Sequence, residues 1–193
     1  VKDVLSPLQG ILEERKPLVI TMAAGISMEE LEAMAGTPLP IIRIMPNTPT
    51  AMGKGVIPYC YNDLVDGETL RDWRADMGFC GLLDPLEERL MDAASALSGS
   101  GPAFCYMFAE ALADGAVACG LPRAKAMEYA AITLSGAAEM LLATGQHPGA
   151  LKDAVCSPGG STIVGVKTLE TKGFRGAVME CVTNTFEKNK NLL

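Results

Sequence analysis

The residues best suited to chemistry stand in the stretch CSPGGSTIVG (156–165), where small and polar residues precede an apolar run with helical spacing. A helix N-terminus leaves several backbone N–H groups without partners and carries a partial positive charge. Two glycines let an anion approach this backbone, and Gly160 stands where a capping glutamate would otherwise fill the site. Ser157 or Ser161 could cap the helix, and Thr162 adds a hydroxyl donor. The stretch therefore predicts either a site for a carboxylate-sized anion or an ordinary helix start.

Three further segments place small or polar residues beside a predicted element. MAAG (22–25) follows a predicted strand, and its small side chains would let a flat ring or a ribose lie close to the backbone. RIMPNTPTAMGKG (43–55) contains the next strand end, where Asn47 and Thr48 offer donors and acceptors. Ligands of open α/β sheets bind beyond the carboxyl ends of the strands, so both segments are suitably placed. LSGSGPAF (97–104) could also bind an anion, although a tight turn before a buried helix explains it as well.

Composition and charge exclude several classes of protein. The 193 residues carry a formal net charge of −7 and no basic cluster, which argues against a nucleic-acid partner. His147 is the single histidine, so a Ser-His-Asp triad or a histidine-rich metal site is not expected. The six cysteines show no C-x-x-C spacing and predict buried free thiols in a reducing cytoplasm. No signal peptide and no apolar run long enough for a transmembrane helix is present, so we expect a cytoplasmic protein.

The elements that must position these residues change in kind near residue 86. The first part alternates between helical spacing and short apolar runs, which predicts a parallel sheet with helical crossovers. Helices are expected over 5–15, 27–34 and 67–81, and strands over 17–25, 40–46, 55–61 and 82–86. Ser27 and Glu30 have the spacing of a capping box at the start of the second helix.

The second part is predicted to be entirely helical. Helices are expected over 87–97, 102–120, 122–145, 147–155, 160–173 and 174–191, several with proline near the start and glycine at the end. The helices over 102–120 and 122–145 are apolar or small nearly all round, which indicates burial on more than one side. We therefore expect an α/β domain over 1–86 and an all-α domain over 87–193 that packs against a second copy of itself.

The motifs together are more specific than any one of them. The segments VK, AAGIS, RIMPNTP, LSGSGPAF, ALADGAVACGLPR, HPGALKD, SPGGSTIVGVKTLE and GFRGAVME occur in this order along the chain. In this order and spacing the chain resembles the pyrroline-5-carboxylate reductase family over essentially its whole length. The stretch from Leu151 through SPGGSTIVGVKTLE is the most diagnostic part.

The resemblance implies a fold and an activity. It implies part of a Rossmann-type domain for NADPH or NADH, followed by a helical domain for dimerisation and substrate binding, in a homodimer or an assembly of dimers. The implied reaction is hydride transfer to the imine carbon of 1-pyrroline-5-carboxylate, which gives L-proline in the last step of proline biosynthesis. Such a reduction needs no nucleophile and no metal, but a hydride donor held about 3–3.5 Å from the carbon.

The resemblance also implies roles for individual residues, carried over position by position. The implied substrate-binding residues are Ser157, Gly160, Ser161, Thr162 and Glu88. The implied cofactor-binding residues are Val1, Lys2, Met22, Ala23, Ala24 and Asn47. Thr162 is the implied catalytic residue, and because a threonine is a poor acid, the imine either arrives protonated or receives its proton through water.

Two departures from the family pattern keep other functions open. The 193 residues contain no G-x-G-x-x-G segment, so the first mononucleotide half of a Rossmann domain is not found in this sequence, and Asp3 stands where proline is usual. One alternative is a non-catalytic helical dimerisation module with an incomplete cofactor domain. The other is a dehydrogenase of the 6-phosphogluconate or 3-hydroxyacid group. That group has a catalytic lysine on an early helix of its second domain, whereas PAFCYMFAEALADG (102–115) has none.

Overall fold

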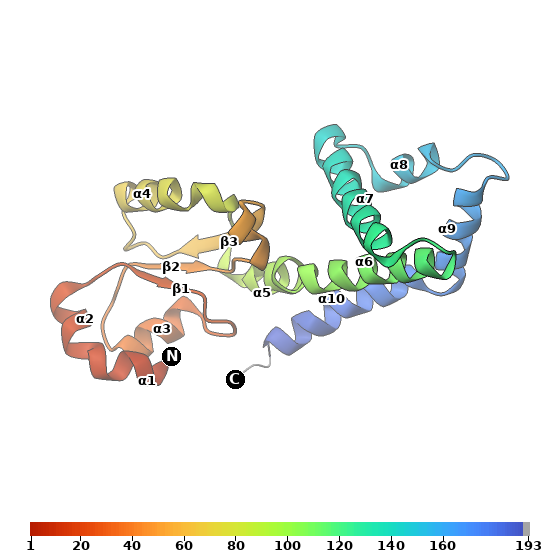
Figure 1. The fold of residues 1–193 in the computed structure, drawn as a ribbon. Helices are drawn as coiled ribbons and strands as arrows, with labels where there is room; N and C mark the ends of the chain where they lie inside the picture. Colours follow the sequence, from red (N-terminus) through yellow and green to blue (C-terminus); the bar gives the residue numbers. More distant parts are fainter. Residues whose placement is uncertain (191–193) are drawn as a thin grey trace. The chain divides into compact units, whose positions relative to one another are not determined.

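The computed structural model describes residues 1–190 (Figure 1). The chain divides into two compact units, one made of Val1–Pro102 with the stretch from Val182 onward, and the other of Ala103–Cys181. These contact units are not the sequence domains 1–86 and 87–193, and that division stays a prediction. Each unit is described by itself below.

The first unit is built on a four-stranded sheet with the order β1-β2-β3-β4. Its strands are β1 (Val19–Thr21), β2 (Ile41–Ile44), β3 (Gly55–Tyr61) and β4 (Gly81–Pro85). The expected strands are confirmed, but the sheet is mixed and not parallel throughout, because β2 and β3 run antiparallel. The connection between β2 and β3 contains only the short 3₁₀ turn η2 (Thr48–Met52), and parallel strands would need a longer crossover.

Helices cover both faces of this sheet. Figure 1 shows α4 (Gly67–Met77) on one side of the strands, and α1 (Lys2–Leu5), α2 (Gln9–Arg15) and α3 (Met28–Ala35) on the other. Every residue of β2 is buried as a result. Ile41 packs into the cluster beneath α1 to α3, while Ile42 and Ile44 pack with Tyr59 and Trp73 beneath α4.

Two helix starts show how far local sequence decides structure. The expected capping box is confirmed, since Ser27 Oγ accepts from Glu30 N–H at 3.1 Å and Glu30 Oε2 accepts from Ser27 N–H at 2.8 Å. The helix expected over 5–15 begins earlier and is divided by a 3₁₀ turn, η1 (Ser6–Leu8). Pro7 lies in that turn and has no N–H to continue an α-helical ladder.

The helix expected over 87–97 is three short pieces. A 3₁₀ turn η4 (Glu88–Leu90) leads into α5 (Met91–Ala94) and then into a π-helical turn, η5 (Ser95–Gly99). The long helix α6 (Gly101–Ala118) follows.

The remaining helices match the expected ones to within a few residues. They are α7 (Arg123–Thr144), α8 (Pro148–Ala154), α9 (Ser161–Thr171) and α10 (Phe174–Lys190). Residue 191, the last of the helix expected over 174–191, lies outside the described residues. In residues 1–190, no helix has the length and apolar character needed to cross a membrane.

The helical unit buries little by itself. Its buried core cluster consists of three alanines, Ala113, Ala126 and Ala130. Large apolar side chains on α6 and α7 stay exposed, including Met107 at 70%, Ile132 at 64% and Leu142 at 86%. The helices that were expected to be buried on several sides therefore have open apolar faces in a single chain.

The same openness corrects the prediction for the cysteines. Cys60 is buried, whereas Cys105 and Cys119 are exposed, so the expectation of buried thiols is wrong for these two in the single chain. Among residues 1–190, none of the six cysteines forms a disulfide. Cys105 lies on α6 and Cys119 directly follows it.

Candidate active site

The loop between α8 and α9 has the geometry that its glycines predict. Gly160 is the N-cap of α9, and no side chain of residues 1–190 caps this helix, so Ser157 and Ser161 do not take the capping role proposed for them. The loop closes through Gly160 N–H, which donates to the Ser157 carbonyl at 3.0 Å. The backbone conformation at Gly160 is extended, which leaves Ser161 already inside the helix and Ser157 in the preceding turn.

The two glycines of this loop serve different purposes. Gly159 has a φ of 72°, a left-handed conformation that favours glycine. A Cβ atom at Gly160 would collide with Ser157 Oγ and lie 3.2 Å from the Ser157 carbonyl oxygen. Ser157, Ser161 and Thr162 are exposed, so the start of α9 presents hydroxyl groups and backbone N–H groups without a capping side chain.

Four of the six cofactor-side candidates lie at one edge of the sheet. β1 and β2 run parallel with Thr21 opposite Arg43, so both strands end at the same level. The residues that follow them, Met22 to Ala24 and Asn47, therefore share the carboxyl edge of these two strands.

Val1 and Lys2 lie at the start of α1, where Val1 is the N-cap. This short helix packs on α3, and both residues are exposed.

Asn47 uses both ends of its amide within the first unit. Its Nδ2 donates to the Ser98 carbonyl at 2.9 Å, and its Oδ1 accepts from Val56 N–H at 2.9 Å. Its sequence position at a strand end suggested a residue that faces a ligand, and the structure gives it contacts that hold the loop.

Glu88 belongs to a charged cluster that sequence reasoning missed. Arg43 lies on β2 with its side chain 4% exposed, and its Nη1 and Nη2 donate to Glu88 Oε1 at 3.3 Å and Asp92 Oδ1 at 3.2 Å. Glu88 Oε1 also accepts from Met28 N–H, at the start of α3, at 2.8 Å. The signal that could have found the cluster is a lone arginine inside the apolar strand PIIRIMP (40–46), because a buried arginine requires carboxylate partners.

Cys60 lies opposite Arg43 in the β2–β3 register, beside this cluster. Burial raises the pKa of its thiol to about 11, the negative charge of Glu88 adds to the shift, and Arg43 partly offsets it. The thiol is therefore protonated at neutral pH and unsuited to nucleophilic chemistry.

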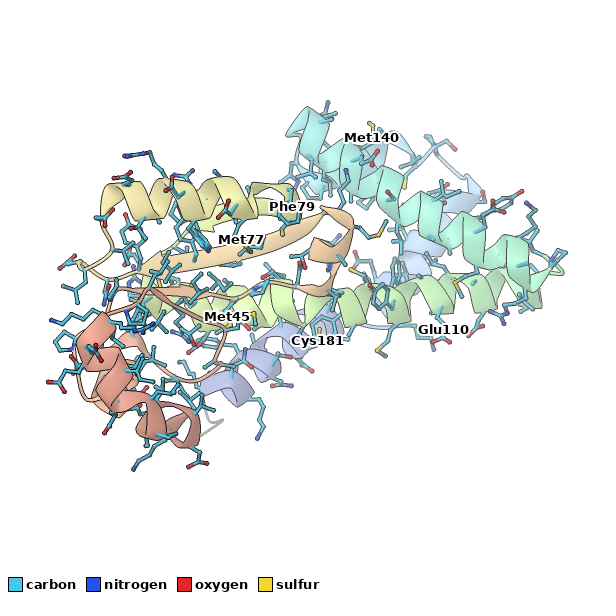
Figure 2. All side chains as sticks on the ribbon, turned by 60° about the vertical axis from the view of Figure 1, so that its left-hand side comes forward. Met45, Met77, Phe79, Glu110, Met140 and Cys181 are labelled. Atoms are coloured by element: carbon cyan, nitrogen blue, oxygen red, sulfur yellow. The ribbon has the colours of Figure 1, made fainter. Side chains whose placement is uncertain are left out.

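The structure contains two hollows of interest, one within each unit. A hollow of about 320 Å³ is lined by Met28, Tyr59, Cys60, Tyr61, Pro85, Leu86, Glu87 and Glu88. A larger hollow of about 580 Å³ lies between α7 and α8, with a lining that is almost entirely apolar and includes Met140 and Leu151. Figure 2 labels Met140 on α7. Residues 1–190 hold no group of three or more His, Cys, Asp or Glu side chains that could bind a metal ion.

Comparisons with known proteins identify the family. Residues 88–192 match the family described as pyrroline-5-carboxylate reductase dimerisation. Pyrroline-5-carboxylate reductase of Escherichia coli (strain K12) is 43% identical over 189 residues, which cover 98% of this chain and 70% of the relative. The Glycine max protein of the same name is 43% identical over 192 residues, covering 100% of this chain and 69% of the relative. The chain belongs to the pyrroline-5-carboxylate reductase family.

Solved structures of pyrroline-5-carboxylate reductases share the fold. The Plasmodium falciparum pyrroline carboxylate reductase, crystallised with NADP bound, superposes with a TM-score of 0.92 at 35% identity, covering 98% of this chain and 76% of that one. The Coxiella burnetii structure gives a TM-score of 0.87 at 34% identity, covering 99% and 71%. The resemblance seen in the motifs and the expected fold class, an α/β part followed by a helical dimerisation region, are confirmed. The match favours this enzyme family over the 6-phosphogluconate and 3-hydroxyacid dehydrogenases.

Proposed function

We propose that this chain acts in the reduction of 1-pyrroline-5-carboxylate to L-proline with NADPH or NADH as the hydride donor. The observation that carries the proposal is the start of α9, a glycine-built and uncapped helix N-terminus in a chain of this family. The competing idea, a dimerisation module without catalytic function, would not require hydroxyl groups beside that backbone.

The substrate side of the proposal uses the loop before α9. The carboxylate of the substrate accepts from the backbone N–H groups of Ser161 and Thr162 at the start of α9, where the helix dipole favours an anion. Gly160, whose own N–H donates to the Ser157 carbonyl, leaves room for the anion beside this backbone. Ser157 contributes its hydroxyl to the same end of the helix. Thr162 donates to the ring nitrogen, or relays a proton to it through water, as hydride reaches the imine carbon. A contact from Glu88 would have to use Oε2, because both hydrogen bonds that the structure gives its carboxylate are on Oε1.

The cofactor side uses the edge beyond β1 and β2. Met22, Ala23 and Ala24 fit a flat ring or a ribose because the two alanines are small and Met22 is 64% exposed. A bound nicotinamide cofactor would supply the hydride. Val1 and Lys2 are proposed to lie beside the nucleotide, and Asn47 beside the nicotinamide. The cytoplasmic location expected from the sequence stays a prediction.

The proposal includes a homodimer formed through residues 102–145. The core between α6 and α7 consists of three alanines and leaves the large apolar side chains of both helices exposed. A second copy of the chain supplies matching helices that cover them. An obligate interface of this kind buries more than about 2,000 Å². Sedimentation at micromolar concentration should show a dimer or an assembly of dimers, and a folded monomer alone would contradict the proposal.

The catalytic proposal is tested by three substitutions in the loop. Thr162→Val keeps the shape and deletes the hydroxyl, so kcat/KM should fall roughly tenfold to a thousandfold. Gly160→Val should raise KM for the substrate, because the new side chain meets Ser157 and crowds the anion. Ser157→Ala should cost less, since water can replace part of its contact. Thermal melting of each variant is the control, and a Thr162→Val variant that keeps full kcat/KM while melting earlier would reduce the hydroxyl to a structural role.

A further inference from the structure

The carbonyl of Ser98 lacks the partner that an α-helix would give it. In a helix, the carbonyl of one residue accepts from the N–H four residues later, and four residues after Ser98 stands Pro102, which has no N–H. Ser98 lies in the π-helical turn η5, directly before α6 begins at Gly101. In a partly buried turn, such an acceptor requires a donor other than the N–H four residues later.

Asn47 supplies that donor. Its Nδ2 donates to the Ser98 carbonyl at 2.9 Å, in a partly buried contact between residues 51 positions apart. Its Oδ1 accepts from Val56 N–H at 2.9 Å, which fixes the orientation of the amide. The Ser98 hydroxyl in turn donates to the Ala94 carbonyl at 2.8 Å. One side chain thus joins the loop after β2, the strand β3 and the π-helical turn.

We propose that Asn47 is a positioning residue that holds the loop over 45–54 and the turn η5 in a single arrangement. The loop lies at the sheet edge where Met22 to Ala24 also end, so its position sets the shape of that edge. π-helical turns often occur at functional sites, and this one is closed by a side chain from outside the helix. The joint, meaning the pair of hydrogen bonds that join Asn47 to Ser98 and Val56, is a property of the fold, while its effect on turnover rests on the proposed function.

The contact pattern separates this role from that of a direct ligand. A ligand-binding asparagine would present its amide outward, whereas this amide is oriented by two backbone groups on opposite ends. The role also differs from simple stabilisation, because a joint at the sheet edge should affect cofactor use and not stability alone.

Asn47→Asp is the decisive variant. The aspartate keeps an acceptor for Val56 N–H, but it places a second oxygen against the Ser98 carbonyl in place of the donor. Hydrogen exchange of the peptide that spans 95–104 should speed up roughly fivefold to a hundredfold, the effect of one orphaned acceptor. KM for the cofactor should rise, with a smaller change in kcat.

Pro102→Ala is the matched rescue, because it restores an N–H four residues after Ser98. Alone it should change little, since Asn47 already satisfies the carbonyl. In the double variant with Asn47→Asp, it should recover a large part of the exchange protection and of kcat/KM. Met52→Gln, an exposed change in the same loop, is the control and should leave both measurements unaltered.

Each outcome decides the proposal. Faster exchange that Pro102→Ala reverses, together with a raised cofactor KM, supports it. Lost turnover with unchanged exchange would make Asn47 a direct ligand, and a lower melting temperature with unchanged kinetics would make it only structural. Either result, or the absence of rescue by Pro102→Ala, overturns the proposal. If the unaltered protein shows no turnover, the proposed function fails, while the exchange experiment still decides whether the joint exists.

Discussion

Replacing Arg43 by methionine should destabilise the first unit more than any change to an exposed ion pair. Methionine can fill the space of the aliphatic stem, so the main loss is the charge that Glu88 and Asp92 share. Removing one member of a buried ion pair costs about 3–5 kcal/mol, because the remaining charge is left uncompensated. The two carboxylate side chains are 31% and 30% exposed, so water offsets part of that loss. We therefore expect the free energy of unfolding to fall by about 2–3 kcal/mol.

Urea unfolding followed by tryptophan fluorescence measures the free energy of unfolding of the first unit. Trp73 is the single tryptophan of the chain, lies in the core beneath α4, and is 5% exposed. With a urea dependence of roughly 2 kcal/mol per molar, the midpoint should fall by about 1–1.5 M. Arg43→Lys keeps the charge but loses the planar fork, so its midpoint should lie between those of the other two proteins.

The matched control is the exposed ion pair between Arg89 and Glu87. Its atoms are closer, at 2.7 Å, but both side chains are about 70% exposed, at 71% and 68%. Arg89→Met should therefore change the free energy of unfolding by less than about 1 kcal/mol. If Arg43→Met moves the midpoint no further than Arg89→Met, the reasoning from burial is wrong. Asp92→Asn added to Arg43→Met should restore part of the loss, because it removes one orphaned charge.

Three further outcomes are expected from single features of the first unit. Gly81→Ala should lower the melting temperature strongly, because φ is 138° and the new Cβ would collide with backbone atoms of Gly55; Gly78→Ala, which has open space, is its control. Hydrogen bonds from the N–H and hydroxyl groups at the start of α4 lower the pKa of the Asp66 carboxyl, so its cap is intact above the ordinary aspartate pKa. Protection of the first α4 amides from hydrogen exchange should therefore be lost as the pH falls through that lowered pKa. If the unaltered protein and the Asp66→Asn variant show the same dependence of protection on pH, the role of the charge is refuted. Because burial raises the pKa of Cys60 to about 11, its alkylation at pH 8 should be slow in the folded protein and fast in urea; equal rates would show that the thiol is accessible.

Local signals in the sequence predicted what depends on neighbours along the chain. The capping box at Ser27 and Glu30 follows from spacing alone, because both partners lie within one turn of the helix. The helices from 101 to 190 and the strands at 41–44 and 55–61 also followed from apolar periodicity and from proline and glycine positions. The family resemblance rested on the same short segments, read in their order.

The sequence was a weaker guide where two distant segments meet. It predicted a parallel sheet, and the antiparallel pairing of β2 with β3 emerged only in the structure, since pairing direction depends on where a loop leads the chain. It placed Glu88 near a ligand without finding Arg43, its partner 45 residues away. It assigned Ser157 or Ser161 as a cap, but the turn geometry made Gly160 the N-cap.

By itself, the sequence determined the elements, the family and the set of residues from which a site can be built, because these depend on local patterns. Only the tertiary structure decided what those residues contact. Asn47 looked like a ligand-facing amide in the loop PNTP, yet its two hydrogen bonds reach a strand and a helical turn far along the chain. The physical reason is that burial removes water as a partner, so each buried polar group must find its donor or acceptor wherever the fold brings one.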